Sequence, residues 1–242
     1  MSERIVITGM GCISAAGHNL TQHVAALKAG RRACSKPTLF EAPFESPVFE
    51  VSDPIYRGTD EEIRTSKLLW KAVSESLARA ALKELPSDKV LGIFLGTTTA
   101  CQLNALRFQE EYYAGKTPSL ASPRRFLESN LAQWVGRKLG HTAGPRITVT
   151  NACASGTEAI GLAFDGMRRG MCDIAIAGGA DELGLVSYCG FHALGVLSSE
   201  PCRPFDRNRQ GLNLGEGAGV LVLEHETAAR QRGMATRLFV AG

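Results

Sequence analysis

A length of 242 residues with a hydrophobic content of 44% is sufficient for a sizeable buried core, in one large domain or two small ones. The 27 basic and 24 acidic residues give a formal charge of +3, which is too weak a bias to indicate a nucleic-acid partner. No apolar run approaches the length needed to cross a bilayer, so we expect no membrane insertion.

The seven cysteines are scattered along the chain without the Cys-x-x-Cys spacing of zinc and redox sites. The first residues also lack the charged and apolar regions of a signal peptide. Because structural disulfides belong to oxidising compartments, these features predict a reduced, cytoplasmic protein with neither disulfides nor a zinc site.

The N-terminal residues predict a buried strand, a sharp turn and a capped helix. Residues 4–8 form a short apolar run, and the glycines of 9–11 are expected to turn the chain over the edge of a sheet. Asn19 or Thr21 is placed to cap a following helix. Residues 31–58, rich in proline, serine and aromatic side chains, predict an irregular excursion.

The middle of the chain alternates between helical and strand patterns. Residues 60–85 begin with acids and carry apolar side chains at helical spacing, and residues 90–96 read as a buried strand. The segment from Thr97 is expected to become helical through residue 113, and residues 122–139 predict another helix. This alternation indicates an α/β fold.

The most informative stretch is ITVTNACASG at 147–156, a β-branched strand followed by a tight turn that holds Cys153. A helical pattern and a second buried strand, 173–179, complete a strand–turn–helix–strand unit. The first N–H groups of a helix lack intrahelical partners and its dipole favours negative charge, so a thiol at this junction is stabilised as thiolate. Small neighbours leave room for a substrate and for backbone amides near an oxyanion, which suits acyl transfer. The alternative is that Cys153 is a small buried hydrophobe.

The C-terminal third predicts a mixture of helix and loop over 182–197, and a polar, turn-rich segment over 203–211. The glycine-rich residues 214–223 lead into a buried strand, and 234–241 is expected to start another after a short helix. Glu216 is flanked by glycines, where an acid more often satisfies neighbouring amides than serves as a general base. We therefore predict a structural role for Glu216.

Four motifs follow one another in this order: NACASG at 151–156, IAIAGGA at 174–180, RPFDRNRQG at 203–211 and LGEGAG at 214–219. Together with RIVITGMG at 4–11, they resemble the N-terminal half of the β-ketoacyl synthases, which are thiolase-like condensing enzymes. The resemblance implies a layered αβαβα fold, of which residues 1–242 form the N-terminal domain, with a mostly parallel sheet and helical insertions. The C-terminal half of the family is not found in this chain.

In that family the cysteine that matches Cys153 carries the acyl chain as a thioester. The resemblance implies decarboxylative Claisen condensation of an acyl thioester with malonyl-acyl carrier protein, in fatty acid or polyketide biosynthesis. It also implies that no metal or organic cofactor is needed, because the phosphopantetheine arm arrives on the carrier protein.

Two further residues gain a role from the resemblance. Phe191, which follows Gly190, resembles the pocket-lining aromatic of the family, and Thr99 lies near the position of a bulkier apolar gate in many relatives. Both are therefore predicted to bind substrate by lining the acyl pocket. The alternatives are that Phe191 is an ordinary core aromatic and that Thr99 caps a helix.

The resemblance also predicts what completes the site. In the family two histidines from the C-terminal half assist decarboxylation, whereas the only histidines after Cys153 are His192 and His225. His141 lies in a Gly-His-Thr tripeptide but precedes Cys153 at a helix-to-strand connection, so we predict no catalytic role for it. We expect a homodimer or heterodimer, an acyl carrier protein partner, and a C-terminal synthase half or second chain. The alternatives are a non-catalytic binding or assembly module and a thiolase relative.

Overall fold

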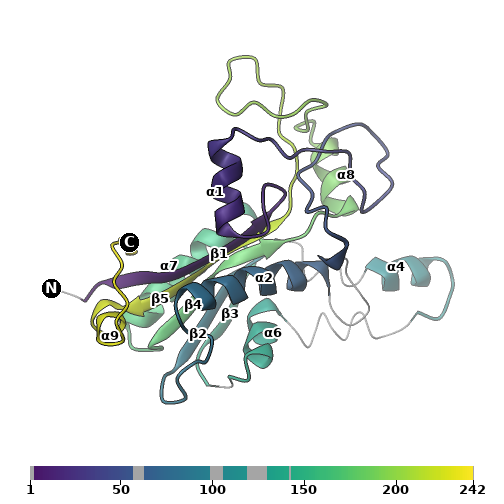
Figure 1. The fold of residues 1–242 in the computed structure, drawn as a ribbon. Coiled ribbons are helices and arrows are strands. Elements are labelled where there is room, and N and C mark those ends of the chain that lie inside the picture. Colours follow the sequence, from purple (N-terminus) through teal and green to yellow (C-terminus); the bar gives the residue numbers. More distant parts are fainter. Residues whose placement is uncertain (1–2, 57–62, 99–105, 119–129, 142, 242) are drawn as a thin grey trace.

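The structure is a computed structural model and describes residues 3–56, 63–98, 106–118, 130–141 and 143–241. Within these residues one five-stranded sheet has the order β1-β5-β4-β2-β3, made by Ile5–Ser14 (β1), Leu91–Gly96 (β2), Arg146–Val149 (β3), Ile174–Asp181 (β4) and Gly217–His225 (β5). β2 pairs in parallel with β3 and with β4, whereas β5 is antiparallel to both β4 and β1. All strands except β5 therefore run in one direction, which confirms the predicted mostly parallel sheet (Figure 1).

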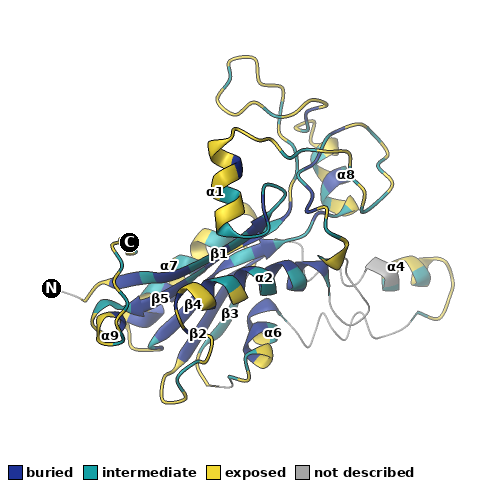
Figure 2. Cartoon of the chain, viewed as in Figure 1, coloured by how far each residue is buried: buried dark blue, intermediate teal, exposed yellow. Residues whose placement is uncertain are grey.

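Helices cover both faces of this sheet (Figure 1). On one face lie α2 (Arg64–Arg79) and α6 (Leu131–Lys138), whose apolar side chains form the larger buried cluster with the strands. On the other face lies α7 (Ser155–Arg168), which packs Ala159 and Ala163 near Phe94 of β2. Figure 2 shows that the strands and the helix faces turned toward them are buried. The described chain thus forms a helix–sheet–helix unit.

The predicted turn at residues 9–11 is wrong, because β1 continues through these glycines to Ser14. The strand contains a bulge after Ile7 and then pairs with β5 along the rest of its length. A Cβ atom at Gly9 would clash with the carbonyl oxygen of Ser76, and one at Gly11 with that of Ala72. The glycines therefore allow the backbone of α2 to approach the strand closely, rather than turning the chain.

The helix predicted after residue 18 is confirmed as α1 (Leu20–Lys28), and the side chain of Asn19 accepts a hydrogen bond from the backbone N–H of Gln22 at 2.9 Å. As far as it is described, the irregular excursion that follows contains a short 3-10 helix, Pro54–Tyr56, and two isolated bridges, Ser35 to Val48 and Phe49 to Gly215. It packs Phe40 and Phe44 around Tyr188 of α8 (Leu185–Ala193). This region lies beyond the carboxyl end of the parallel strands (Figure 1).

The bounds of two predicted helices change for local reasons. α2 ends at Arg79 rather than near residue 85, since Ala81 has a left-handed backbone and the chain turns to bury Leu82. The helix predicted from residue 122 begins, within the described residues, at Leu131, because Asn130 is extended and its side chain caps the helix. The helical segment before residue 113 is α4 (Leu106–Tyr113), whereas acids 60–62 lie outside the described residues.

The C-terminal residues form α9 (Glu226–Gln231), as expected, but no regular strand over 234–241. Only an isolated bridge joins Phe239 to Val6 of β1, supported by backbone hydrogen bonds on either side of it. None of the helices in the described ranges has the length and apolar character that a membrane span requires. The six cysteines within these ranges are free thiols.

Candidate active site

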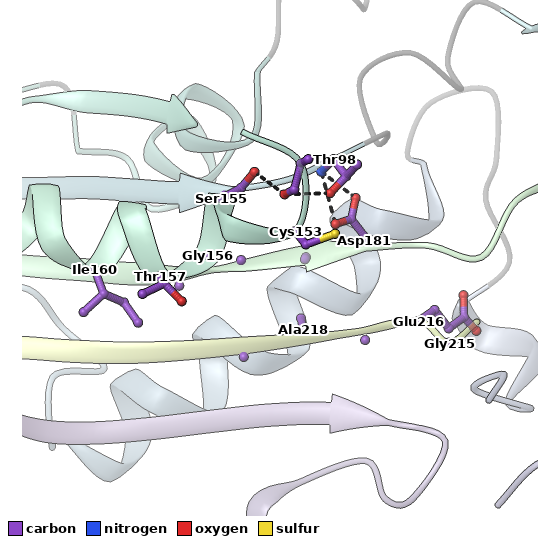
Figure 3. A pocket seen from close by; sticks show the side chains of 17 residues that line it. Thr98, Cys153, Ser155, Gly156, Thr157, Ile160, Asp181, Gly215, Glu216 and Ala218 are labelled. Carbon is purple, nitrogen blue, oxygen red and sulfur yellow. Dashed lines mark hydrogen bonds between the residues drawn. The ribbon is translucent and has the colours of Figure 1, made fainter. Parts of the chain in front are cut away.

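A pocket of about 500 Å³ opens at the carboxyl end of the parallel strands, between β2, β4, β5 and the start of α7 (Figure 3). Glycines from β2, β4, α7, β5 and the residues just before β5 supply much of its wall: Gly96, Gly156, Gly178, Gly179, Gly215, Gly217 and Gly219. The polar side chains among its lining residues include Thr98, Cys153 and Asp181. Ligands in α/β proteins commonly bind outside the carboxyl ends of parallel strands, so this is the candidate site.

Cys153 lies in a short 3-10 turn, Ala152–Ala154, between the end of β3 and the first residue of α7. The thiol residue is exposed and lines the pocket, so the alternative reading of Cys153 as a buried hydrophobe is wrong. Its position just before Ser155 places it at the positive end of the α7 dipole, where unpaired N–H groups favour an anion. The location predicted from the sequence, between a strand and a helix, is confirmed.

The residue before the cysteine has an unusual backbone. Ala152 has φ +46°, in the left-handed region that costs a residue with a side chain roughly 1–2 kcal/mol. Its carbonyl oxygen accepts hydrogen bonds from the hydroxyl groups of Ser155 at 2.7 Å and Thr98 at 3.1 Å (Figure 3). The Ser155 hydroxyl also accepts the N–H of Asn151 at 2.7 Å. These bonds hold the turn in the conformation that presents Cys153.

The carboxylate of Asp181, at the end of β4, fixes Thr98 in turn. It accepts the backbone N–H of Thr98, with distances of 2.9 and 3.1 Å to its two oxygens, and the hydroxyl of Thr97 at 2.9 Å. Sequence reasoning missed this contact. The sequence could have indicated it, because Thr97 directly follows one strand and Asp181 closes another, and parallel neighbouring strands bring their carboxyl ends together.

Glycines let the first turn of α7 sit directly on the strands. A Cβ atom at Gly96 would lie 2.5 Å from the backbone nitrogen of Gly156 and closer still to the carbonyl group of Ser155. A Cβ atom at Gly179 would lie 2.8 Å from the carbonyl oxygen of Gly96. The height of α7 above the sheet, and with it the position of Cys153, therefore depends on these small residues.

We expect Gly96→Ala to lower the free energy of unfolding by roughly 1–3 kcal/mol, because the added methyl group overpacks a backbone contact. The matched control is Gly161→Ala on α7, where a Cβ atom meets nothing within 4 Å and where alanine is the better helix former. Urea unfolding of both variants measures the effect. An unchanged free energy for Gly96→Ala would show that α7 tolerates displacement from the sheet.

Glu216 also borders the pocket, but its carboxylate faces the protein interior and is fully buried. It accepts the backbone N–H groups of Val51 at 2.7 Å and Leu183 at 3.1 Å, and the Nε–H of the buried Arg64 at 2.8 Å. Burial by itself lowers the pKa of Arg64, but the hydrogen bond and charge of Glu216, together with the charges of Glu50 and Glu182, outweigh it and raise that pKa. The predicted structural role of Glu216 is confirmed.

The other predicted site residues lie elsewhere. Phe191 is half-buried on α8 and is not among the residues that line the Cys153 pocket, so its role in binding stays a prediction. Thr99 lies outside the described residues. His192 stacks on Phe44 with ring centroids 3.6 Å apart, and His141 precedes β3 at the opposite end from Cys153. None of the five histidines, all of which the structure describes, lines the pocket.

The fold and the pocket together define an α/β protein that presents an exposed thiol between a parallel strand and the helix that covers it. Residues 2–229 match the family model described as "Beta-ketoacyl synthase, N-terminal domain". The chain therefore belongs to the β-ketoacyl synthase family, as the sequence motifs predicted.

Individual relatives agree with this assignment. The chain is 31% identical to 3-oxoacyl-[acyl-carrier-protein] synthase 2 of Synechocystis sp., over 96% of this chain and 60% of that protein. It is 30% identical to the tetracenomycin polyketide synthase ketoacyl synthase alpha subunit of Streptomyces glaucescens, over 96% of this chain and 60% of that one. The chain thus spans about 60% of the length of these relatives.

Solved structures place the fold in the same group. The ishigamide ketosynthase/chain length factor superimposes with a TM-score of 0.91 at 31% identity, covering 100% of this chain and 63% of that chain. A β-ketoacyl synthase from Burkholderia phymatum superimposes with a TM-score of 0.80 at 28% identity, covering 96% of this chain and 62% of that chain. The predicted thiolase-like α/β fold class is therefore confirmed.

Proposed function

We propose that this chain provides the acyl-accepting part of a β-ketoacyl synthase, in which Cys153 carries the growing acyl chain as a thioester. The observation that carries the proposal is the exposed Cys153 thiol at the start of α7, facing a pocket of about 500 Å³. The names of the relatives, which include a 3-oxoacyl-[acyl-carrier-protein] synthase and a polyketide ketoacyl synthase, support this chemistry.

In the first step, the Cys153 thiolate attacks the carbonyl carbon of an acyl thioester delivered on the phosphopantetheine arm of an acyl carrier protein. The carbon–sulfur bond to the carrier breaks, the carrier thiolate leaves and takes up a proton, and acyl-Cys153 remains. The anionic tetrahedral intermediate needs backbone N–H donors, and the first turn of α7, which begins two residues after Cys153, can supply them.

In the second step, a malonyl thioester on the carrier loses carbon dioxide. The electron pair of the broken carbon–carbon bond attacks the carbonyl carbon of acyl-Cys153, and the Cys153 thiolate leaves. The product is a β-ketoacyl thioester extended by two carbons. The chain supplies the thiolate, whereas no histidine lines its pocket, so we assign the groups that stabilise the decarboxylation to a second part of the enzyme.

Exposed apolar side chains on the described chain support association with a second polypeptide or a C-terminal half. Leu194, after α8, is 73% exposed, and Phe205 is fully exposed at a loop that projects from the body of the molecule (Figures 1 and 2). The loop is held in shape by Arg203, which donates to the carbonyl oxygen of Asn208 at 3.0 Å, and by its ion pair with Asp206. Apolar side chains presented in this way favour association, in a homodimer or heterodimer.

The test is acylation of the chain by an acyl carrier protein that bears a fatty acyl group. Peptide mass spectrometry should find the acyl mass on the peptide that contains Cys153 and on no other cysteine peptide. An acyl group confined to another cysteine, or none on any, would overturn the proposal. The second candidate, a non-catalytic binding or assembly module, rests on the absence of a histidine from the pocket lining and predicts carrier binding without an acyl adduct.

A further inference from the structure

We propose that Asp181 is a positioning residue for Cys153, acting through Thr98 on the backbone of Ala152. The inference rests on the proposed function, because it concerns how the acyl-accepting thiol is held. Asp181 accepts the N–H of Thr98, and the hydroxyl of Thr98 donates to the carbonyl oxygen of Ala152, which immediately precedes the cysteine.

The topology explains why these residues meet although 83 positions separate Thr98 from Asp181. Asp181 ends β4, Thr98 follows β2, and Ala152 follows β3. The three strands are parallel neighbours in the order β4-β2-β3, so their carboxyl ends lie side by side. Each strand contributes one member of a chain of hydrogen bonds that ends at the cysteine turn (Figure 3).

Ala152 is the point at which this chain of bonds acts. Its left-handed backbone is one that only glycine adopts freely, so the turn needs external contacts to persist. Ser155 holds the same carbonyl oxygen from within the turn, at 2.7 Å. Thr98 is the contact from outside the turn, and its own backbone is fixed by both carboxylate oxygens of Asp181. Without the hydrogen bond from Thr98, Cys153 is no longer held in one orientation relative to α7.

The test measures the rate at which iodoacetamide alkylates Cys153 at neutral pH, followed by peptide mass spectrometry. We expect Asp181→Ala and Thr98→Val each to slow this reaction roughly tenfold, because small displacements of a reacting group have large effects on rate. The double variant should be no slower than the slower single variant, since both substitutions break the same chain of bonds. Thr98→Ser, which keeps the hydroxyl, should stay within about twofold of wild type.

Asp181→Asn separates hydrogen bonding from charge. Asparagine keeps an acceptor oxygen but removes the negative charge, so it should restore most of the rate that alanine loses. Equal slowing by asparagine and alanine would assign the effect to charge and overturn the positioning role. The matched controls are Asp165→Asn, which removes a charge from the last turns of α7, and Thr21→Val, which removes a hydroxyl from exposed α1; both should leave the rate unchanged.

Cys172 reports on folding in the same experiment. It is buried, and burial raises the pKa of its thiol to about 11, so it should resist alkylation while the fold is intact. Slow alkylation of Cys153 with Cys172 protected supports the inference. Rates at Cys153 within twofold of wild type in both Asp181→Ala and Thr98→Val would overturn it, as would exposure of Cys172 in both. If Cys172 becomes exposed in Asp181→Ala but stays protected in Thr98→Val, the alkylation rate of Cys153 in Thr98→Val decides whether the inference holds.

Acylation by the carrier protein is measured in parallel on the wild-type chain. A wild-type chain that accepts no acyl group contradicts the proposed function, whereas the alkylation ratios still test the positioning of Cys153. If the wild-type chain is acylated but Cys153 is alkylated at the wild-type rate in the variants, only the positioning role is contradicted.

Discussion

Replacing Cys153 with alanine is expected to abolish the acyl adduct completely, because the alanine side chain has no atom that can attack a thioester. The fold should be unaffected. Cys153 is exposed, and the contacts that shape its turn are made by Ala152 and Ser155, so the free energy of unfolding should change by less than about 0.5 kcal/mol. Intact-mass spectrometry after incubation with the acyl carrier protein measures the adduct.

The control for this substitution is Cys34→Ala, which removes a partly exposed thiol from the irregular excursion, away from the pocket. This variant should acquire the acyl group as the wild-type chain does. Undiminished adduct in Cys153→Ala would reject Cys153 as the nucleophile and direct attention to the other free cysteines.

Glu216→Ala is expected to produce the largest loss of stability, about 3–5 kcal/mol, because it leaves a buried guanidinium without its carboxylate. Among the residues that the structure describes, Arg64 would keep its hydrogen bond to the carbonyl oxygen of Val51 and lose those to Glu216. The backbone N–H groups of Val51 and Leu183 would also lose their acceptor. Chemical unfolding followed by circular dichroism measures the change.

Two further variants test this explanation. Arg64→Met should cost less than Glu216→Ala, because the carboxylate of Glu216 would still accept two backbone N–H groups. Arg230→Ala removes an exposed ion pair with Glu226 on α9 and should cost only about 0.3–0.5 kcal/mol. A loss below about 1 kcal/mol in Glu216→Ala would mean that water or another side chain replaces the missing carboxylate.

Together, the two substitutions distinguish residues that carry out acyl transfer from residues that stabilise the fold at the same pocket. Cys153 and Glu216 both border it, yet the first should control acyl transfer with little effect on stability, and the second should control stability. The difference arises from burial, since the thiol faces the pocket whereas the carboxylate faces the interior. Whether a residue at the edge of the pocket acts on a substrate or on stability therefore depends on whether its polar atoms face the pocket or the protein interior.

The sequence by itself determined the order of the elements and the place of the cysteine. β-Branched residues followed by small residues predicted β3, the turn at Cys153 and α7, because strand and helix periodicities are local properties of the chain. The cap of α1 at Asn19 was equally local. The glycines flanking Glu216 favoured a structural acid, although its cationic partner, Arg64, lies 152 residues away and was not predicted.

Tertiary structure alone decided the contacts between these elements. β1 extends through Gly9 and Gly11 because α2 packs closely against these glycines. Residues 234–241 form no regular strand, because only Phe239 makes a bridge to β1. The chain of hydrogen bonds from Asp181 through Thr98 to Ala152 exists because β4, β2 and β3 are parallel neighbours. Pattern and propensity act within a few residues, whereas strand order and side-chain pairing are set by the burial of surfaces from distant parts of the chain.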